Sequence, residues 1–302
     1  MDIVVGLSAD DSGEDAVALG ALLSHLLGAK VVLVYVHPPT IDYPSVGHVD
    51  AEWAAFLAER AEETLTQARG QLSRYWAEND VESMVVPHVS AGRALRKVSE
   101  QRGAAVTVLG PGARSNPGQI SLGPIAQSLL HGSPTAIALA PEGYRDVAPD
   151  SFERLVVGFQ DTPESAHAVE ACVRMAQPLR LPVHLLTVVL RVNRLIGARV
   201  GRDPERMVMQ SLVERERAAQ ERFIVSSRPE EISASVVTGD TAAAAMSRFD
   251  WHDSDLLVVA SSALGPISRV FLGDLTHKLL RSCTVPAMVL PRRFDADALD
   301  QM

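Results

Sequence analysis

The sequence predicts an α/β fold of two tandem doubly wound domains, each an open five-stranded, mostly parallel sheet flanked by helices. Three observations lead to this prediction. Short valine-rich runs are too apolar for strands with one solvated face, so they are typical of buried parallel strands. Amphipathic segments at helical spacing alternate with these runs, which implies right-handed βαβ crossovers and a Rossmann-like sheet. The whole pattern also occurs twice along the chain.

The internal repeat sets the predicted domain boundaries. Three stretches of the first half have counterparts 150 to 152 residues later, in the same order. They are "IVVGLSADDSGEDAVALGALL" (3–23) with "LVVGFQDTPESAHAVEACVRM" (155–175), "VTVLGPGARSNPGQISLGPIAQSLL" (106–130) with "LLVVASSALGPISRVFLGDLTHKLL" (256–280), and "SPTAIALAP" (133–141) with "CTVPAMVLP" (283–291). Three ordered matches indicate a tandem duplication. We therefore predict domain one at 1–141, a polar linker at 142–153, domain two at 154–291 and a C-terminal tail at 292–302.

The order of predicted elements is the same in both halves. We predict strands at 3–7, 30–36, 83–89, 105–110 and 135–140, and again at 155–159, 182–189, 232–238, 255–260 and 285–290. The predicted helices lie at 11–27, 50–79, 93–102 and 123–131, and at 163–178, 204–226, 241–249 and 273–282. In such sheets ligands bind at the carboxyl ends of the strands, where the strand order reverses. This rule places a site after strands one and four.

Composition and charge exclude several classes of protein. The 302 residues carry a formal net charge of −9, which argues against a nucleic-acid binder because such affinity rests on clustered positive charge. The two cysteines, Cys172 and Cys283, form neither a disulfide framework nor a metal motif. The sequence shows no signal peptide and no run of ~20 apolar residues. We predict a soluble, cytoplasmic protein.

A glycine-rich stretch, "VLGPGARSNPGQISLGP" (108–124), follows the predicted fourth strand of the first half. Glycines let a backbone approach a phosphate closely, and the following helix N-terminus supplies N–H groups and a positive dipole. The stretch therefore has the shape of a phosphate-binding loop. The alternative is a tight surface connection whose glycines and prolines serve only turn geometry.

Both halves resemble the universal stress protein domain, and the match covers nearly everything between Ile3 and Pro291. The resemblance implies an adenine nucleotide alpha hydrolase-like fold. It also implies which residues form a nucleotide-binding site. Members that bind ATP carry a Gly, two residues, Gly, nine residues, Gly, then Ser or Thr after strand four. They also carry an acidic residue at the end of strand one, which meets the adenosine.

Neither half keeps the full set of these residues. The four places of the motif hold Gly110, Ala113, Gly123 and Pro124 in the first half, and Ala260, Ala263, Gly273 and Asp274 in the second. The acidic place holds Ser8 in one half and Gln160 in the other. A gap of one or two residues brings Asp10 or Asp161 there instead, and the sequence does not decide between these alternatives.

The departures from the motif differ in how strongly each one disfavours phosphate binding. Pro124 removes an N–H donor and the hydroxyl together, although it suits the first turn of a helix. Asp274 places a carboxylate near the phosphate position, and two unit charges ~4 Å apart repel by about 4 kcal/mol at an effective dielectric near 20. Arg114 and Ser115 remain able to meet an anion. The candidate nucleotide-binding residues are Ser8, Gly110, Arg114, Ser115, Gly123, Gln160 and Gly273.

We predict a non-enzymatic, stress-linked binding or regulatory module without a cofactor. The sequence shows no Ser–His–Asp arrangement, carboxylate dyad or metal-ligand spacing, so no catalytic or metal-binding residue is assigned. The alternative is a regulator whose first half binds ATP with Mg²⁺, or another adenine nucleotide, and hydrolyses it slowly. A third alternative is an enzyme of the wider adenine nucleotide alpha hydrolase-like fold.

The last predicted strands, "TAIALAP" and "PAMVLP", are strongly apolar and lie at an edge of their five-stranded sheets. An uncovered apolar edge requires a partner. Universal stress domains dimerise through this strand, so the resemblance implies antiparallel pairing of the two halves within one chain. We further expect a homo-oligomer of whole chains and an unidentified protein partner, but neither nucleic acid nor a membrane.

Overall fold

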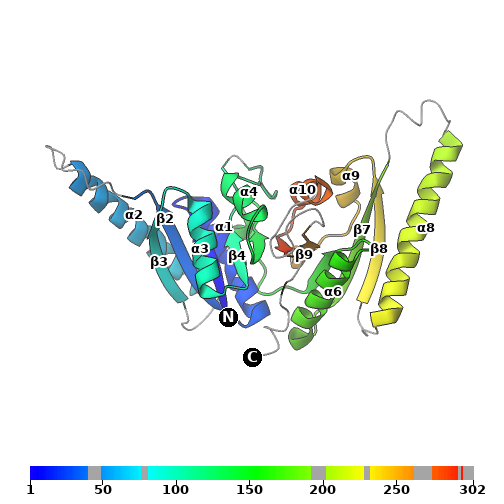
Figure 1. Ribbon diagram of the computed structural model, residues 1–302, viewed down its shortest axis with the longest axis horizontal. Coiled ribbons are helices and arrows are strands. Elements are labelled where there is room, and N and C mark those ends of the chain that lie inside the picture. Colours follow the sequence, from blue (N-terminus) through cyan, green and yellow to red (C-terminus); the bar gives the residue numbers. More distant parts are fainter. Residues whose placement is uncertain are drawn as a thin grey trace.

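A computed structural model describes residues 1–39, 49–75, 81–113, 115–191, 202–227, 232–261, 274–291 and 294 of the chain. Ten strands form one continuous sheet, and helices cover both of its faces (Figure 1). The first half of the chain builds one end of this sheet and the second half builds the other end (Figure 1). The predicted α/β fold class is thereby confirmed.

The first half contains five strands and four long or medium helices, followed by a short helix. In chain order they are β1 (Asp2–Leu7), α1 (Asp11–Leu27), β2 (Lys30–His37), α2 (Val49–Leu72), β3 (Val81–Pro87), α3 (Ala91–Arg102), β4 (Val106–Leu109), α4 (Pro124–Leu130), β5 (Ala136–Leu139) and α5 (Tyr144–Val147).

The second half repeats this order. Its elements are β6 (Arg154–Gly158), α6 (Pro163–Ala176) with the 3₁₀ turn η1 (Gln177–Leu179), β7 (Val183–Leu190), α8 (Arg202–Ser227), β8 (Ile232–Gly239), α9 (Ala242–Met246), β9 (Asp255–Ala260), α10 (Asp274–Arg281) and β10 (Ala287–Leu290).

Three helices differ from the sequence prediction. The helix predicted at 50–79 ends at Leu72, because the following amides of Arg74 and Tyr75 bond three residues back and tighten the last turn. The helix predicted at 241–249 ends at Met246, whose carbonyl accepts the Trp251 Nε1–H at 3.0 Å. Helix α5 lies inside the predicted linker and was not predicted.

The strand order of the sheet is β3-β2-β1-β4-β5-β10-β9-β6-β7-β8. Neighbouring strands are parallel within each half, whereas β5 and β10 pair antiparallel at the centre. Met288 lies opposite Ala138 and Val289 lies opposite Ile137. All residues of β5 and β10 are buried, so each strand covers the edge that the other would expose.

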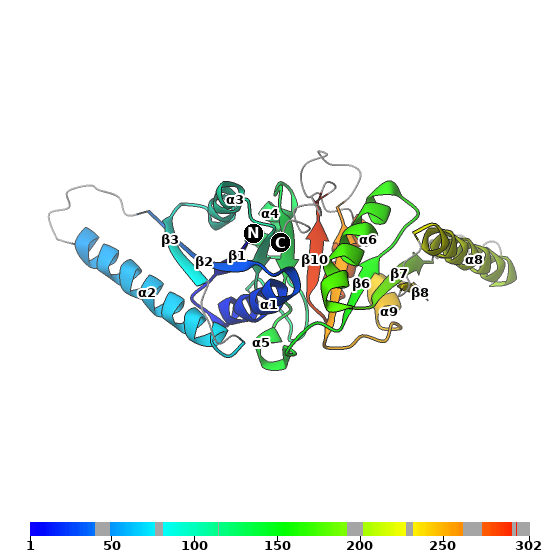
Figure 2. The ribbon, with the colours of Figure 1, turned by 90° about the horizontal axis from the view of Figure 1, so that it is seen from below.

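The two halves share their hydrophobic cores. On one face of the sheet, α1 and α6 touch near the junction of the halves (Figure 2), and a single cluster of buried side chains includes Leu19 of α1 and Cys172 of α6. The cluster on the opposite face likewise joins Leu129 of α4 to Leu280 of α10. Helices α2 and α8 cover the outer strands at opposite ends of the molecule (Figure 1).

The connection between the halves is held by Asp15, a fully buried carboxylate on α1. Its oxygens accept the backbone N–H of Gly143 at 3.0 Å and of Arg145 at 2.9 Å, which anchors the start of α5. The Arg145 guanidinium also pairs with Asp15, Asp11 and Glu14 at 3.1–3.6 Å. Burial raises the pKa of Asp15, and the two N–H bonds and Arg145 oppose that rise.

The end of β4 packs directly on the start of α1. An added Cβ at Gly110 would lie 1.8 Å from the carbonyl oxygen of Ser12 and 2.7 Å from its carbonyl carbon. Only glycine therefore fits at this position without moving one of the two backbones. The first glycine of the predicted phosphate loop has a packing role in the fold.

We expect Asp15→Asn to lower the free energy of unfolding by about 3 kcal/mol, because it breaks a buried charged pair and turns an amide N–H toward other donors. Denaturant unfolding measures the loss. The control Asp11→Asn removes a mostly exposed partner of the same Arg145 and should change this free energy by less than about 1 kcal/mol. Equal losses in the two variants would contradict the anchoring role of Asp15.

We expect Gly110→Ala to lower the free energy of unfolding by about 3 kcal/mol, since a backbone clash forces β4 and α1 apart. Thermal unfolding in the absence of any ligand checks this. Gly70→Ala is the matched control, because no atom lies within 4 Å of the added Cβ and alanine favours the helix by about 0.5–1 kcal/mol. A stable Gly110→Ala variant would show that the two elements separate easily.

Candidate functional site

The predicted site lies where the strand order reverses, at the carboxyl ends of β1 and β4. These strands are parallel neighbours, with Gly6 opposite Leu109. The chain leaves β1 toward α1 on one face of the sheet and leaves β4 toward α4 on the other face. The structure thus brings Ser8 and the 110–123 loop to the same end of the sheet, as the sequence predicts.

Ser8, Asp10 and Ser12 form one hydrogen-bonded unit at the end of β1. Asp10 is the N-cap of α1, and its Oδ1 accepts from the Ser12 amide at 3.2 Å and from the Ser8 and Ser12 hydroxyls at 2.5 Å each. Partial burial raises the pKa of Asp10, but the bonds from Ser12 and Ser8 outweigh it and leave this pKa below its usual value. An ionised carboxylate therefore stands beside Ser8.

The glycine loop closes on itself. An added Cβ at Gly112 would lie 2.9 Å from both the Cα and the N of Gly123, and the Gly112 amide donates to the Ser121 carbonyl at 3.2 Å. The family motif assigns Ala113, not Gly112, to the place of its second glycine. The contact that the structure forms therefore involves a glycine that the motif did not select, although the sequence "GPG" contains it.

Ser115 bonds within the protein. Its Oγ lies 2.6 Å from Glu142 Oε2 and 2.7 Å from the Gly112 carbonyl oxygen, two acceptors for its single proton. The Glu142 backbone also fixes the loop, since its carbonyl accepts from Gly118 at 2.9 Å and its amide donates to Gln119 at 3.1 Å. Glu142 had no role in the sequence prediction. Arg114 lies outside the described residues.

The helix after the loop offers few donors at its start. Gly123 is the N-cap of α4, so this position has no side chain to bond the helix amides, and Pro124 follows at the first helical position. Proline carries no backbone N–H, so one donor that a phosphate would use is missing. Pro124 thus occupies the first helical position, as the sequence predicts.

In the second half, the described candidates also bond within the protein. The backbone N–H of Gln160 donates to Ser165 Oγ at 3.2 Å, and Asp161 pairs with Arg222 at 3.1 Å on the surface. Gly273 and Ala263 lie outside the described residues. Asp274 begins α10, but its side chain is outside the described part of the chain.

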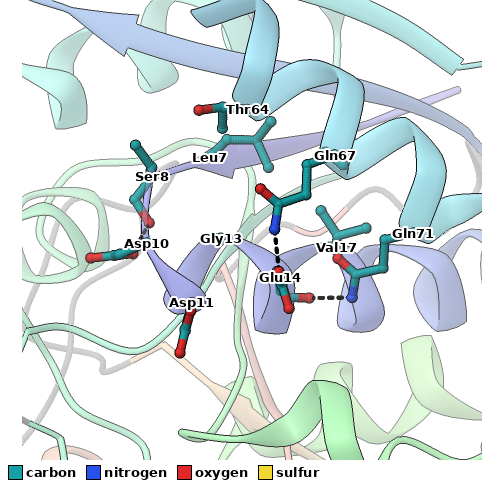
Figure 3. Close-up of a pocket in the computed structure, with 12 residues that line it drawn as sticks. Leu7, Ser8, Asp10, Asp11, Gly13, Glu14, Val17, Thr64, Gln67 and Gln71 are labelled. Carbon is teal, nitrogen blue, oxygen red and sulfur yellow. Dashed lines mark hydrogen bonds between the residues drawn. The ribbon is translucent and has the colours of Figure 1, made fainter. Parts of the chain in front are cut away.

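A cleft of about 160 Å³ opens between α1 and α2 beside the end of β1 (Figure 3). It is lined by Leu7, Ser8, Ala9, Asp10, Asp11, Gly13, Glu14, Val17, Thr64, Gln67, Ala68 and Gln71. Sequence reasoning identified Ser8 and, as an alternative, Asp10. It missed the residues of α2, because polar side chains on a charged helix carry no sequence signal that separates a cleft from a solvated face.

Other site types find little support in the described part of the chain. No group of three or more His, Cys, Asp and Glu residues there is arranged to hold a metal ion. Both cysteines are buried and free, and burial raises the pKa of Cys283 to about 12, which makes a reactive thiolate unfavourable. None of the described helices is long and apolar enough to cross a membrane.

Comparisons with known proteins agree with this fold. A universal stress protein of Mycobacterium tuberculosis strain H37Rv is 30% identical over 295 residues, which cover 96% of this chain and 100% of that protein. A universal stress protein from Archaeoglobus fulgidus has a solved structure that covers 97% of this chain and 98% of its own, with a TM-score of 0.66 and 14% identity. A functionally unknown protein from Pseudomonas aeruginosa covers 99% of this chain and 95% of its own, with a TM-score of 0.56 and 12% identity.

The family model of the universal stress proteins matches the chain twice, at residues 1–141 and 151–291. One match falls in each half of the internal repeat, so the predicted resemblance and the tandem arrangement are both confirmed. The chain belongs to the universal stress protein family, of which it carries two domains in tandem.

Proposed function

We propose that this chain is a non-enzymatic binding or regulatory module of a stress response that does not hold ATP through its glycine loop. The observation that carries the proposal is the 2.6 Å bond between Ser115 Oγ and Glu142 Oε2. The Ser115 hydroxyl, which could otherwise donate to a bound anion, donates to the Glu142 carboxylate. An incoming phosphate would lose this donor and would meet a second negative charge.

The magnitude of this repulsion is large enough to decide the outcome. Two unit charges ~4 Å apart repel by about 4 kcal/mol at an effective dielectric near 20, which is roughly a thousandfold in Kd. Pro124 removes one further donor.

The alternative function is an adenine-nucleotide regulator that uses the first half, with ATP and Mg²⁺ as ligand. One observation favours it: the carboxylate of Asp10 stands at the end of β1, held there by Ser8 and Ser12. A carboxylate at this place can accept hydrogen bonds from the hydroxyls of a ribose. The family motif thus keeps a candidate for adenosine contact while its phosphate loop is altered.

Other expectations remain predictions from the sequence. They concern a homo-oligomer of whole chains, an unidentified protein partner, the absence of enzymatic activity and a cytoplasmic location. Substitution of Gly110 is a poor probe of nucleotide binding, because an added Cβ would disturb the packing of α1 even if no ligand binds.

We expect millimolar ATP with Mg²⁺ to leave the thermal unfolding midpoint of the wild-type protein unchanged, because Glu142 repels the phosphates. A ligand at about 100 times its Kd would stabilise the protein by about 2.7 kcal/mol and raise this midpoint by a few degrees. The measurement is a thermal unfolding series with and without ATP, together with mass spectrometry of any nucleotide that co-purifies.

Two variants separate the effect of the Glu142 charge on ATP binding from that of the Ser115 hydroxyl. Glu142→Gln keeps the shape of the side chain and removes its charge, so it should acquire an ATP-dependent shift that the wild-type protein lacks. Ser115→Ala removes the hydroxyl but leaves the carboxylate, so it should not respond to ATP. A wild-type shift of several degrees that Asp10→Asn abolishes would overturn the proposal in favour of the adenine-nucleotide alternative.

A further inference from the structure

The cleft between α1 and α2 has features of a ligand site that the glycine loop does not explain. In Figure 3, Gln67 and Gln71 reach down from α2 toward Glu14 on α1, while Ser8 and Asp10 close the other end. Both ends of the cleft are therefore polar. Leu7, Val17 and Ala68 contribute apolar wall between them.

Gln71 marks the inner end of the cleft with an unsatisfied acceptor. The residue is only 8% exposed, and its Nε2 donates to the Glu14 backbone carbonyl at 2.8 Å. Its Oε1 has no hydrogen-bond partner among the described residues. A buried carbonyl oxygen without a donor costs about 1–3 kcal/mol, so a group that donates to this oxygen would remove a real penalty.

The uncharged polar side chains of the lining each use a donor within the protein. The Ser8 hydroxyl donates to Asp10, and the Thr64 hydroxyl donates to the Arg60 carbonyl at 2.8 Å. The amide nitrogens of Gln67 and Gln71 donate to the side chain and backbone of Glu14. Each glutamine amide keeps a second N–H, but the Ser8 and Thr64 hydroxyls can offer a ligand only oxygen acceptors, and Gln71 Oε1 accepts from no described residue, so a ligand that supplies donors suits the cleft.

The charge of the cleft also favours a positively charged ligand. Asp10, Asp11 and Glu14 line it, and none of the described residues of its lining is Lys, Arg or His. Arg145 of the α5 segment pairs with Asp11 and Glu14, but no described basic residue forms an ion pair with Asp10. At least one ionised carboxylate is therefore left to attract a cation, and a phosphate would be repelled.

We propose that the α1–α2 cleft binds a small organic cation, a primary ammonium or guanidinium compound, between Asp10 at the mouth and Gln71 Oε1 at the inner end. A volume of about 160 Å³ admits a short linear chain of this kind. Several N–H donors at one group match several oxygen acceptors, and the apolar wall suits a methylene chain. This proposal does not depend on whether the glycine loop binds ATP.

The test is calorimetric titration of the full chain with butane-1,4-diamine and agmatine, without nucleotide. We expect saturable binding of at least one of them, and none of butane-1,4-diol or succinate, which have the same length but are neutral or acidic. In a ¹⁵N-labelled sample, the side-chain amide resonance of Gln71 should shift with the same saturation. Added salt should weaken the binding because the attraction is electrostatic.

Variants locate the binding in the cleft. Asp10→Asn keeps a residue that caps a helix well but removes the charge, and Gln71→Leu removes the unsatisfied oxygen at similar volume. Each should raise the Kd at least tenfold. Glu59→Gln, an equal loss of charge on α2 outside the lining, should change it less than twofold. Thermal unfolding without ligand verifies that each variant is folded.

Three results would overturn the proposal. They are the absence of saturable binding for both cations, equal binding of succinate, and cation binding that neither Asp10→Asn nor Gln71→Leu weakens in folded protein. A response to ATP in the thermal assay that persists in Asp10→Asn would count against the proposed function of the loop and would leave this proposal unaffected. The two proposals therefore fail independently.

Discussion

The antiparallel pair of β5 and β10 is the constraint on which the rest of the structure depends. Each half would otherwise end in an apolar strand with unpaired N–H and C=O groups. Pairing satisfies both edges at once and lets the buried side chains of the two halves form shared clusters on both faces of the sheet. The contact between α1 and α6 and the position of α5 follow from this arrangement, since both bridge the halves beside the junction.

Helix α1 connects the junction to the candidate site. Its buried Asp15 anchors the segment between the halves, and Arg145 from that segment neutralises part of the acidic first turn. Asp10 caps the same helix and holds Ser8, but forms no ion pair with a described basic residue. At the acidic start of α1, Asp11 and Glu14 therefore pair with Arg145 of the linker, whereas Asp10 faces the α1–α2 cleft. A ligand at Asp10 would lie about one and a half helical turns from Asp15, which anchors the segment between the halves.

The glycine loop shows how residue types that suit a phosphate can serve the fold instead. Gly110 allows β4 to approach Ser12, and Gly112 packs against Gly123. The Ser115 hydroxyl meets the carboxylate of Glu142 in place of an anion. Backbone proximity is what a phosphate loop requires of its glycines, and close packing of two chain segments requires the same property. Composition alone cannot separate the two uses.

The sequence by itself determined the fold class, the duplication and the end of the sheet where a site would lie. Apolar runs, helical periodicity and repeats are local or regular patterns, and they survive without knowledge of tertiary contacts. Only the tertiary structure decided that Glu142 faces Ser115, that Gly112 meets Gly123, and that Gln71 lies against Glu14 with one oxygen that has no partner among the described residues. These partners are brought together by the packing of α1, α2 and the chain after β5. Their separation along the sequence fixes no distance between side chains, so the satisfaction of each polar atom is settled only when the segments pack.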